Sequence, residues 1–228
     1  MPAPLMSKPD LLARLMDLFR EKGFDGASLS DISESTGLGK SSLYHHFPNG
    51  KEEMGLKVLA HLEEQLEAAL FEPMQSADKP AKKLERMLDT VDSFYESGKK
   101  ACLLERLCAS ADARAFRRPL GRAFSRWMDA VETLGVEAGL PRAIARRRAE
   151  DMVVRIEGAL VVCAGTGDTS VFVRTIRDLR ETVLARPPLR PDDPLTKGGR
   201  PSSRFDQRRP YHRIETTGSI RDARRAGR

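Results

Sequence analysis

Residues 37–51, GLGKSSLYHHFPNGK, gather side chains that suit contact with a nucleic acid. Lys40 and Lys51 supply positive charge, Tyr44 supplies a hydroxyl that can donate to a phosphate, and two small serines stand between them. Lys51 also falls at a predicted helix start, where free backbone N–H groups favour an anion. The stretch contains no Asp or Glu. These side chains together suit contact with the phosphates and base edges of a duplex.

The net charge of the whole chain is less informative than this local pattern. The formal charge is +6, but residues 186–228 hold 12 basic and 5 acidic residues. The remaining residues hold 27 basic and 28 acidic residues, so they are close to neutral. The basic balance therefore belongs to the tail, and the acid-free stretch stands out against a neutral body.

Helix signals place this stretch in a helix-turn-helix arrangement. Apolar spacing and glycine stops predict three short helices, at 7–22, 28–36 and 40–47. Ser28 and Asp31 form a capping-box-like start for the second helix. Gly37 ends that helix and can adopt a positive φ without a Cβ penalty. Ile32, Leu38 and Leu43 fall where apolar side chains are needed to lock the two helices together.

The rest of the chain predicts longer helices and then a tail. Apolar residues recur at spacings of three and four through residues 51–185, and no alternating strand pattern or repeat is present. The predicted fold class is all-α. We expect an N-terminal three-helix domain at 1–50 and a helical domain at 51–185. Residues 186–228 are rich in Gly, Ser and Arg with few apolar residues, which predicts a disordered basic tail.

Several function classes lack support in the sequence. No apolar run reaches the roughly 18 residues of a membrane span, and the N-terminus has no secretory signal, so we expect a cytoplasmic protein. No catalytic motif, phosphate-binding glycine loop or paired-carboxylate motif is found, so we expect neither an enzyme nor a cofactor. His45 and His46 are adjacent and point about 100° apart on a helix, so we expect no metal site.

The three cysteines, Cys102, Cys108 and Cys163, each lie among apolar residues on predicted helices. Small buried hydrophobic residues are the favoured interpretation. The alternative is a redox sensor that uses Cys102 and Cys108.

The segment LFREKGFDGASLSDISESTGLGKSSLYHHFPNGKEEM resembles the DNA-binding domain of the TetR family of transcriptional regulators. The resemblance covers about residues 7–60. HHFPNGKEEM, ESGKKACLL and IEGALVVC are similar to the LmrA/YxaF-like branch of that family. Gly39, where the family often has Ser, and Gly50, an added residue, depart from the pattern. The DNA-contacting positions implied by the resemblance are Ser28, Ser30, Lys40, Ser41, Ser42, Tyr44, His45, His46 and Lys51.

The resemblance also implies a homodimer whose last two helices form a four-helix bundle with those of the partner. The implied seam consists of apolar residues on these helices: Ile156, Leu160, Cys163, Val171, Phe172, Ile176 and Leu179. The apolar stripes alone leave a second interpretation open, in which the same residues close a monomeric core.

A repressor released from a palindromic operator by a small, mostly apolar or aromatic effector is the function that the resemblance implies. The alternative is a constitutive or architectural DNA-binding dimer without a ligand, aided by the Arg-rich tail. The expected pocket residues are apolar and aromatic: Leu62, Leu66, Phe94, Tyr95, Leu103, Leu107, Phe124, Trp127 and Met128. Glu105, Asp129 and Arg155 are the candidate polar anchors.

Overall fold

The computed structural model describes residues 6–111 and 113–186. Over these residues the chain is helical and has no strand, which confirms the predicted all-α fold class. The helices are α1 (Lys8–Lys22), α2 (Leu29–Thr36), α3 (Lys40–His46), α4 (Gly50–Leu66), α5 (Glu72–Met74), α6 (Pro80–Phe94), α7 (Leu103–Cys108), α8 (Ala113–Glu137), α9 (Arg142–Thr166) and α10 (Ser170–Thr182). A π-helix, η1 (Glu67–Phe71), continues α4 into α5, and a 3₁₀ helix, η2 (Glu96–Gly98), follows α6.

Helix α1 has clear start and stop signals. The Ser7 hydroxyl accepts a hydrogen bond from the backbone N–H of Asp10 at 3.2 Å, which satisfies one free donor of the first turn. Gly23 ends the helix with φ 74°. Between them, Leu11, Leu15, Phe19 and their neighbours form a buried face. This face holds α1 against α2, α4 and α7.

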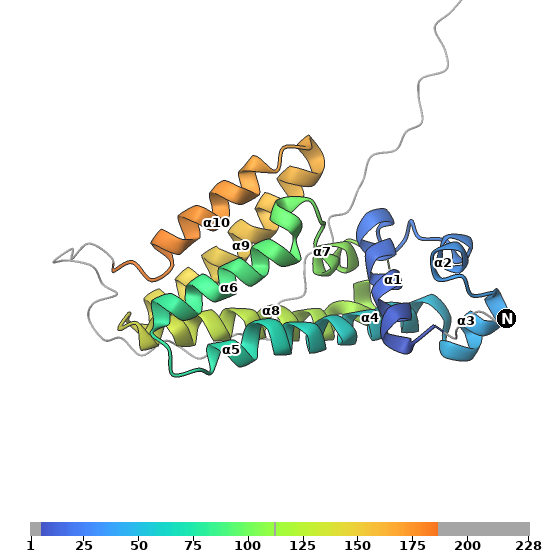
Figure 1. The fold of residues 1–228 in the computed structure, drawn as a ribbon, viewed down its shortest axis with the longest axis horizontal. Coiled ribbons are helices and arrows are strands. Elements are labelled where there is room, and N and C mark those ends of the chain that lie inside the picture. The colour runs from blue at the N-terminus through green and yellow to red at the C-terminus, as the bar shows by residue number, and fades with distance from the viewer. Residues whose placement is uncertain (1–5, 112, 187–228) are drawn as a thin grey trace, which may run out of the picture. The chain divides into compact units, whose positions relative to one another are not determined.

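The longer helices pack by their apolar faces and are joined by ion pairs. Helix α8 runs along α9, α9 contacts α10, and α6 contacts both α8 and α10 (Figure 1). Arg180 Nη2 of α10 lies 2.6 Å from Asp89 Oδ1 of α6. Lys83 Nζ of α6 lies 2.8 Å from Glu137 Oε2 of α8. The buried side chains of these helices belong to one continuous core with those of α1 to α4.

The junction between the first helices and the rest is tightly packed. Phe24, in the loop after α1, lies edge-on to Phe116 of α8, with ring centroids 4.9 Å apart. Gly55 of α4 makes room for both rings, because a Cβ there would lie 2.8 Å from each. Asp25 Oδ2 accepts a hydrogen bond from the backbone N–H of Ala111 at 2.7 Å. Helix α4 starts at the predicted domain boundary near residue 50. Because the hydrophobic core continues across this boundary, the division into two domains stays a prediction.

The predicted disordered tail, 186–228, lies outside the described residues apart from Arg186. Among the helices of the described segments, none combines the length and the apolar character that a membrane span requires.

Candidate nucleic-acid interface and ligand pocket

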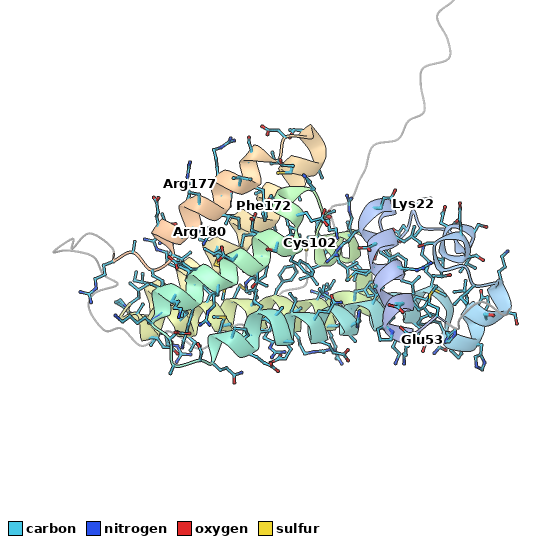
Figure 2. All side chains as sticks on the ribbon, viewed as in Figure 1. Lys22, Glu53, Cys102, Phe172, Arg177 and Arg180 are labelled. Carbon is cyan, nitrogen blue, oxygen red and sulfur yellow. The ribbon has the colours of Figure 1, made fainter. Side chains whose placement is uncertain are left out.

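Helix α2 begins with the predicted capping box. The Ser28 hydroxyl accepts from Asp31 N at 3.1 Å, and Asp31 Oδ2 accepts from Ser28 N at 2.8 Å. Lys22 lies at the end of α1 (Figure 2), and its Nζ is 2.5 Å from Asp31 Oδ1. Hydrogen bonds from Lys22 and then from Ser28 hold the pKa of Asp31 well below its usual range. The start of α2 is therefore fixed to the end of α1.

The turn between α2 and α3 is held in one geometry. Gly37 adopts the left-handed conformation, with φ 71° and ψ 10°, that ends α2. Ile32 and Leu43 are fully buried, and Leu38 is half-buried against the same core. Arg14 Nη1 of α1 donates to the Ser35 carbonyl oxygen at 3.1 Å, which ties α2 to α1. These contacts give α3 a fixed position relative to α1 and α2.

Helix α3 presents its polar side chains to solvent. The predicted contact residues Ser28, Ser30, Lys40, Ser41, Ser42, Tyr44, His45 and His46 are all exposed. Leu43, between them, and Phe47, at the end, point into the core. Gly39 caps α3 without a side-chain hydrogen bond, as its residue type predicts. Because no acid occurs from Gly37 to Lys51, the exposed surface of α3 has the electrostatic character that a phosphate backbone requires.

Lys51 differs from the other predicted contact residues because its side chain already has contacts within the chain. Its Nζ donates to the Asp25 carbonyl oxygen at 3.3 Å and lies 4.8 Å from the centre of the Phe24 ring. The side chain is half-buried and holds the start of α4 against the loop before α2. Gly50, the added residue, adopts φ 73°, a conformation that favours glycine.

A cavity of about 200 Å³ lies between α4, η1, α6, α7 and α8. Six of the nine predicted pocket residues line it: Leu62, Leu66, Phe94, Tyr95, Leu103 and Trp127. Leu107 is buried in the core, while Phe124 and Met128 are partly buried and lie off the cavity wall. The candidate anchors Glu105, Asp129 and Arg155 are also absent from the wall. Phe124 and Met128 each follow a lining residue by one position, so they point about 100° away from it.

The sequence analysis missed nine lining residues: Glu63, Leu70, Phe71, Thr90, Val91, Leu104, Arg122, Ala123 and Arg126. The spacing of four between Ala123 and Trp127 is a usable signal, because it places both on one face of α8. Leu70 follows Leu66 by four residues and gives the same signal, whereas Phe71 gave none, since it lies in the π-helix η1, whose turns differ from α-helical periodicity.

The π-helix is held by one side chain of α8. The Arg126 guanidinium lies 4.4 Å from the centre of the Phe71 ring and forms an ion pair with Glu67. Both partners belong to η1. Arg126 therefore fastens the irregular part of the cavity wall to α8.

Cys102 lies in a buried polar chain beside the cavity. The Tyr95 hydroxyl donates to Cys102 Sγ at 3.3 Å, and Cys102 Sγ donates to Glu157 Oε1 of α9 at 3.3 Å. Burial, and then the charge of Glu157, raise the pKa of the Cys102 thiol well above its usual value. A thiol with a raised pKa is a weak nucleophile, which argues against the redox alternative. Cys108 is exposed and Cys163 is buried.

Burial raises the pKa of Glu157 to about 7. One of its carboxylate oxygens, Oε2, is buried without a hydrogen-bond partner among the described residues. Within the same residues, no group of three or more His, Cys, Asp or Glu side chains is arranged to hold a metal ion.

The predicted dimer residues are mostly buried inside the chain itself. Ile156, Leu160, Cys163, Phe172, Ile176 and Leu179 are buried, and Val171 is half-buried. They pack α9, α10 and α6 against one another within one chain. This burial agrees with the interpretation in which the apolar stripes close a monomeric core. Four other valines of α9 and α10 are exposed instead: Val154 (69%), Val161 (53%), Val162 (44%) and Val173 (49%).

This fold and this exposed helix define a class of protein, the helix-turn-helix transcription regulators with a separate helical domain. The family model for "Bacterial regulatory proteins, tetR family" matches residues 11–57. The model for "Transcriptional regulator LmrA/YxaF-like, C-terminal domain" matches residues 80–178. The chain belongs to the TetR family, in its LmrA/YxaF-like branch, which confirms the resemblance seen in the sequence. This is a family of DNA-binding regulators and not of enzymes.

Individual relatives agree with the family assignment. The regulator LmrA of Bacillus subtilis is 23% identical over 161 residues, which cover 68% of this chain and 85% of LmrA. The negative regulator IcaR of Staphylococcus epidermidis is 44% identical over 45 residues, covering 20% of this chain and 24% of IcaR. A TetR regulator structure from Legionella pneumophila has a TM-score of 0.70 at 18% identity, over 79% of this chain and 99% of that one.

Proposed function

We propose that this regulator is a homodimeric repressor that binds a palindromic operator and is released by a small effector. The observation that carries the proposal is the exposed, acid-free surface of α3, held rigidly by Leu43 and Phe47. Two such helices in a dimer must sit about 34–36 Å apart to enter successive major grooves.

For DNA contact, we assign Lys40 and His45 to base edges and Tyr44 to phosphate. Ser28, Ser30, Ser41, Ser42 and His46 complete the proposed interface. We assign Lys51 a weaker phosphate role, because its Nζ also holds the Asp25 carbonyl oxygen at 3.3 Å.

For the dimer, we propose the exposed side of α9 as the seam. Val154, Gly158, Val161 and Gly165 recur at spacings of three and four and therefore share one helix face. All four are exposed, and the glycines permit close approach of a second helix. Arg177 and Arg180 project from α10 (Figure 2), and Arg180 already pairs with Asp89.

For release, we propose that the effector occupies the cavity lined by Phe94 and Trp127. The support is a direct contact between the cavity wall and the DNA-binding helices. The guanidinium of Arg20, on α1, lies 4.5 Å from the centre of the Phe94 ring. An effector that favours the wrong spacing of the two α3 helices by about 1–3 kcal/mol lowers operator affinity about five- to 150-fold.

A truncation after Arg186 tests this function against the architectural alternative. The proposed repressor is expected to keep its footprint and its sequence preference on the DNA upstream of its own gene, because α3 supplies the specificity. If removal of residues 187–228 abolishes all binding, the architectural alternative is supported instead.

A further inference from the structure

The cavity wall is mostly apolar, and two of its helices contribute charged side chains. Eleven of the fifteen lining residues are apolar or aromatic, among them Phe71, Phe94 and Trp127. The charged lining residues are Arg122 and Arg126 of α8 and Glu63 of α4. A ligand that fills this space must be mainly apolar and must satisfy the charged groups.

The polar groups on the wall are not equally available to a ligand. The Thr90 hydroxyl donates to the Arg86 carbonyl oxygen at 2.9 Å, and the Tyr95 hydroxyl donates to Cys102 Sγ at 3.3 Å. Arg126 is engaged by Glu67 and the Phe71 ring. These groups already have partners within the chain.

Two donors on the wall remain without acceptors. Trp127 is only 7% exposed, and its indole nitrogen is buried. This nitrogen donates to no acceptor among the described residues. Arg122 forms no hydrogen bond or ion pair with another described residue. A buried donor without an acceptor costs free energy that a ligand oxygen removes. The open groups are therefore mostly donors, opposed by the one carboxylate of Glu63.

We infer that the effector is an amphipathic acid, with an apolar body in the cavity and a carboxylate that pairs with Arg122. This inference rests on the proposed function, because it names the ligand of the proposed effector cavity. A guanidinium presents a planar fork of donors that matches a carboxylate. Arg126 is already paired with Glu67, so the Arg122 guanidinium is the open positive charge on the wall that an anionic head would meet.

Three small molecules with one skeleton test the charge of the head group: 4-phenylbutanoic acid, 4-phenylbutanamide and 4-phenylbutan-1-amine. Trp127 is the only tryptophan of the chain, so its emission reports on the cavity wall directly. Each probe is titrated into the full-length protein at pH 7.5. We expect the acid to bind about tenfold more tightly than the amide, because hydrogen bonds to a charged group are the stronger ones.

Arg122→Gln is expected to remove the preference for the acid while the amide still binds. The matched control is Arg118→Gln, an exposed guanidinium one helical turn earlier on α8 that does not line the cavity. This control is expected to keep the preference. Both changes are at exposed positions, and a thermal melt of each variant verifies that it is folded.

Three results overturn the inference. They are equal or tighter binding of the amide or amine, an unchanged acid preference in Arg122→Gln, and no binding of any probe. Binding of the amide or amine without acid preference removes only the assigned class of ligand and leaves the effector cavity standing. The DNA footprint of the truncated chain uses no ligand, so it judges the proposed repressor separately.

Discussion

At the scale of single residues, α3 separates into buried and exposed positions that serve different purposes. Leu43 is 1% exposed and Tyr44 is 48% exposed, although they are neighbours. Leu43 fixes the helix, and Tyr44 is free to reach a phosphate. Side chains that contact phosphate supply affinity for any sequence, whereas those that reach base edges supply specificity.

Tyr44→Phe is expected to weaken binding about three- to tenfold on every duplex, since it removes one hydrogen bond to a phosphate. His45→Ala is expected to change which base pairs are preferred. Fluorescence anisotropy over a panel of single-base operator variants measures both effects. If the two variants return the same ranking of base pairs as the parent, the assigned division between phosphate and base contact is wrong.

Glu157 gives the protein a stability that depends on pH. Burial raises its pKa to about 7 in the folded chain, while a glutamate in the unfolded chain has its ordinary pKa of about 4.5. Between these values the folded chain holds a proton that the unfolded chain releases, so stability falls as the pH rises. The titratable groups that interact with Glu157 are Tyr95, Cys102, Glu105 and Cys108.

Glu157→Gln is therefore expected to be more stable than the parent at pH 8, by up to about 3 kcal/mol. At pH 4.5 the two proteins are expected to have similar stability. Chemical denaturation at a series of pH values measures the difference. Glu85→Gln, at an exposed position of α6, is the control and should show no such trend. A constant difference between Glu157→Gln and the parent across this pH range would contradict the assignment.

At the scale of helices, a cation–π contact between α1 and α6 joins a helix of the DNA-binding region to the cavity wall. Arg20 is only 6% exposed, and two of its nitrogens, Nε and Nη2, are buried without partners. Burial lowers the pKa of its guanidinium. Its compensating contacts are the Phe94 ring at 4.5 Å and Asp17 Oδ1 at 3.7 Å. A ligand that displaces the Phe94 ring would therefore change a contact of Arg20 on α1.

A double-mutant cycle with Arg20→Met and Phe94→Leu measures this connection. We expect a coupling free energy of about 1 kcal/mol in the stability of the folded protein, because the cycle subtracts what each variant loses alone, including the Arg20–Asp17 ion pair, and leaves the cation–π interaction. Arg14→Met combined with Phe94→Leu is the control, since Arg14 bonds to Ser35. Additive effects in the Arg20 cycle would show that the ring and the guanidinium do not interact.

The helices and the cavity differ in how far the sequence could predict them. Apolar spacing, the Ser28 capping box and the Gly37 stop were enough for the first three helices, because these signals are local. Six cavity residues followed from helical faces, but Phe71 required knowledge of the π-helix η1. The periodicity of α9 and α10 indicated a buried face without indicating what buries it. The structure assigns that face to the core of the same chain.

At the scale of the whole molecule, the exposed valines of α9 give the proposed dimer a testable seam. Val161→Glu places a charge at a position that is 53% exposed in the single chain, so the folded monomer should tolerate it. In a dimer the charge would be buried, which is costly. We expect light scattering to report about 25.4 kDa for the variant and about twice that mass for the parent.

Val136→Glu is the matched control for Val161→Glu. Val136 is 46% exposed on α8, outside the proposed seam, and this variant should stay dimeric. If Val161→Glu has the mass of the parent, the α9 seam is wrong.

Selection from random duplex DNA with the full-length protein tests the central claim most directly. The account predicts an enriched inverted repeat whose half-sites lie about 34–36 Å apart, or a multiple of that spacing, and whose bases change when Lys40 or His45 is replaced by Ala. Enrichment of no sequence, or of the same sequence by the parent and both α3 variants, would contradict the claim that α3 reads the operator.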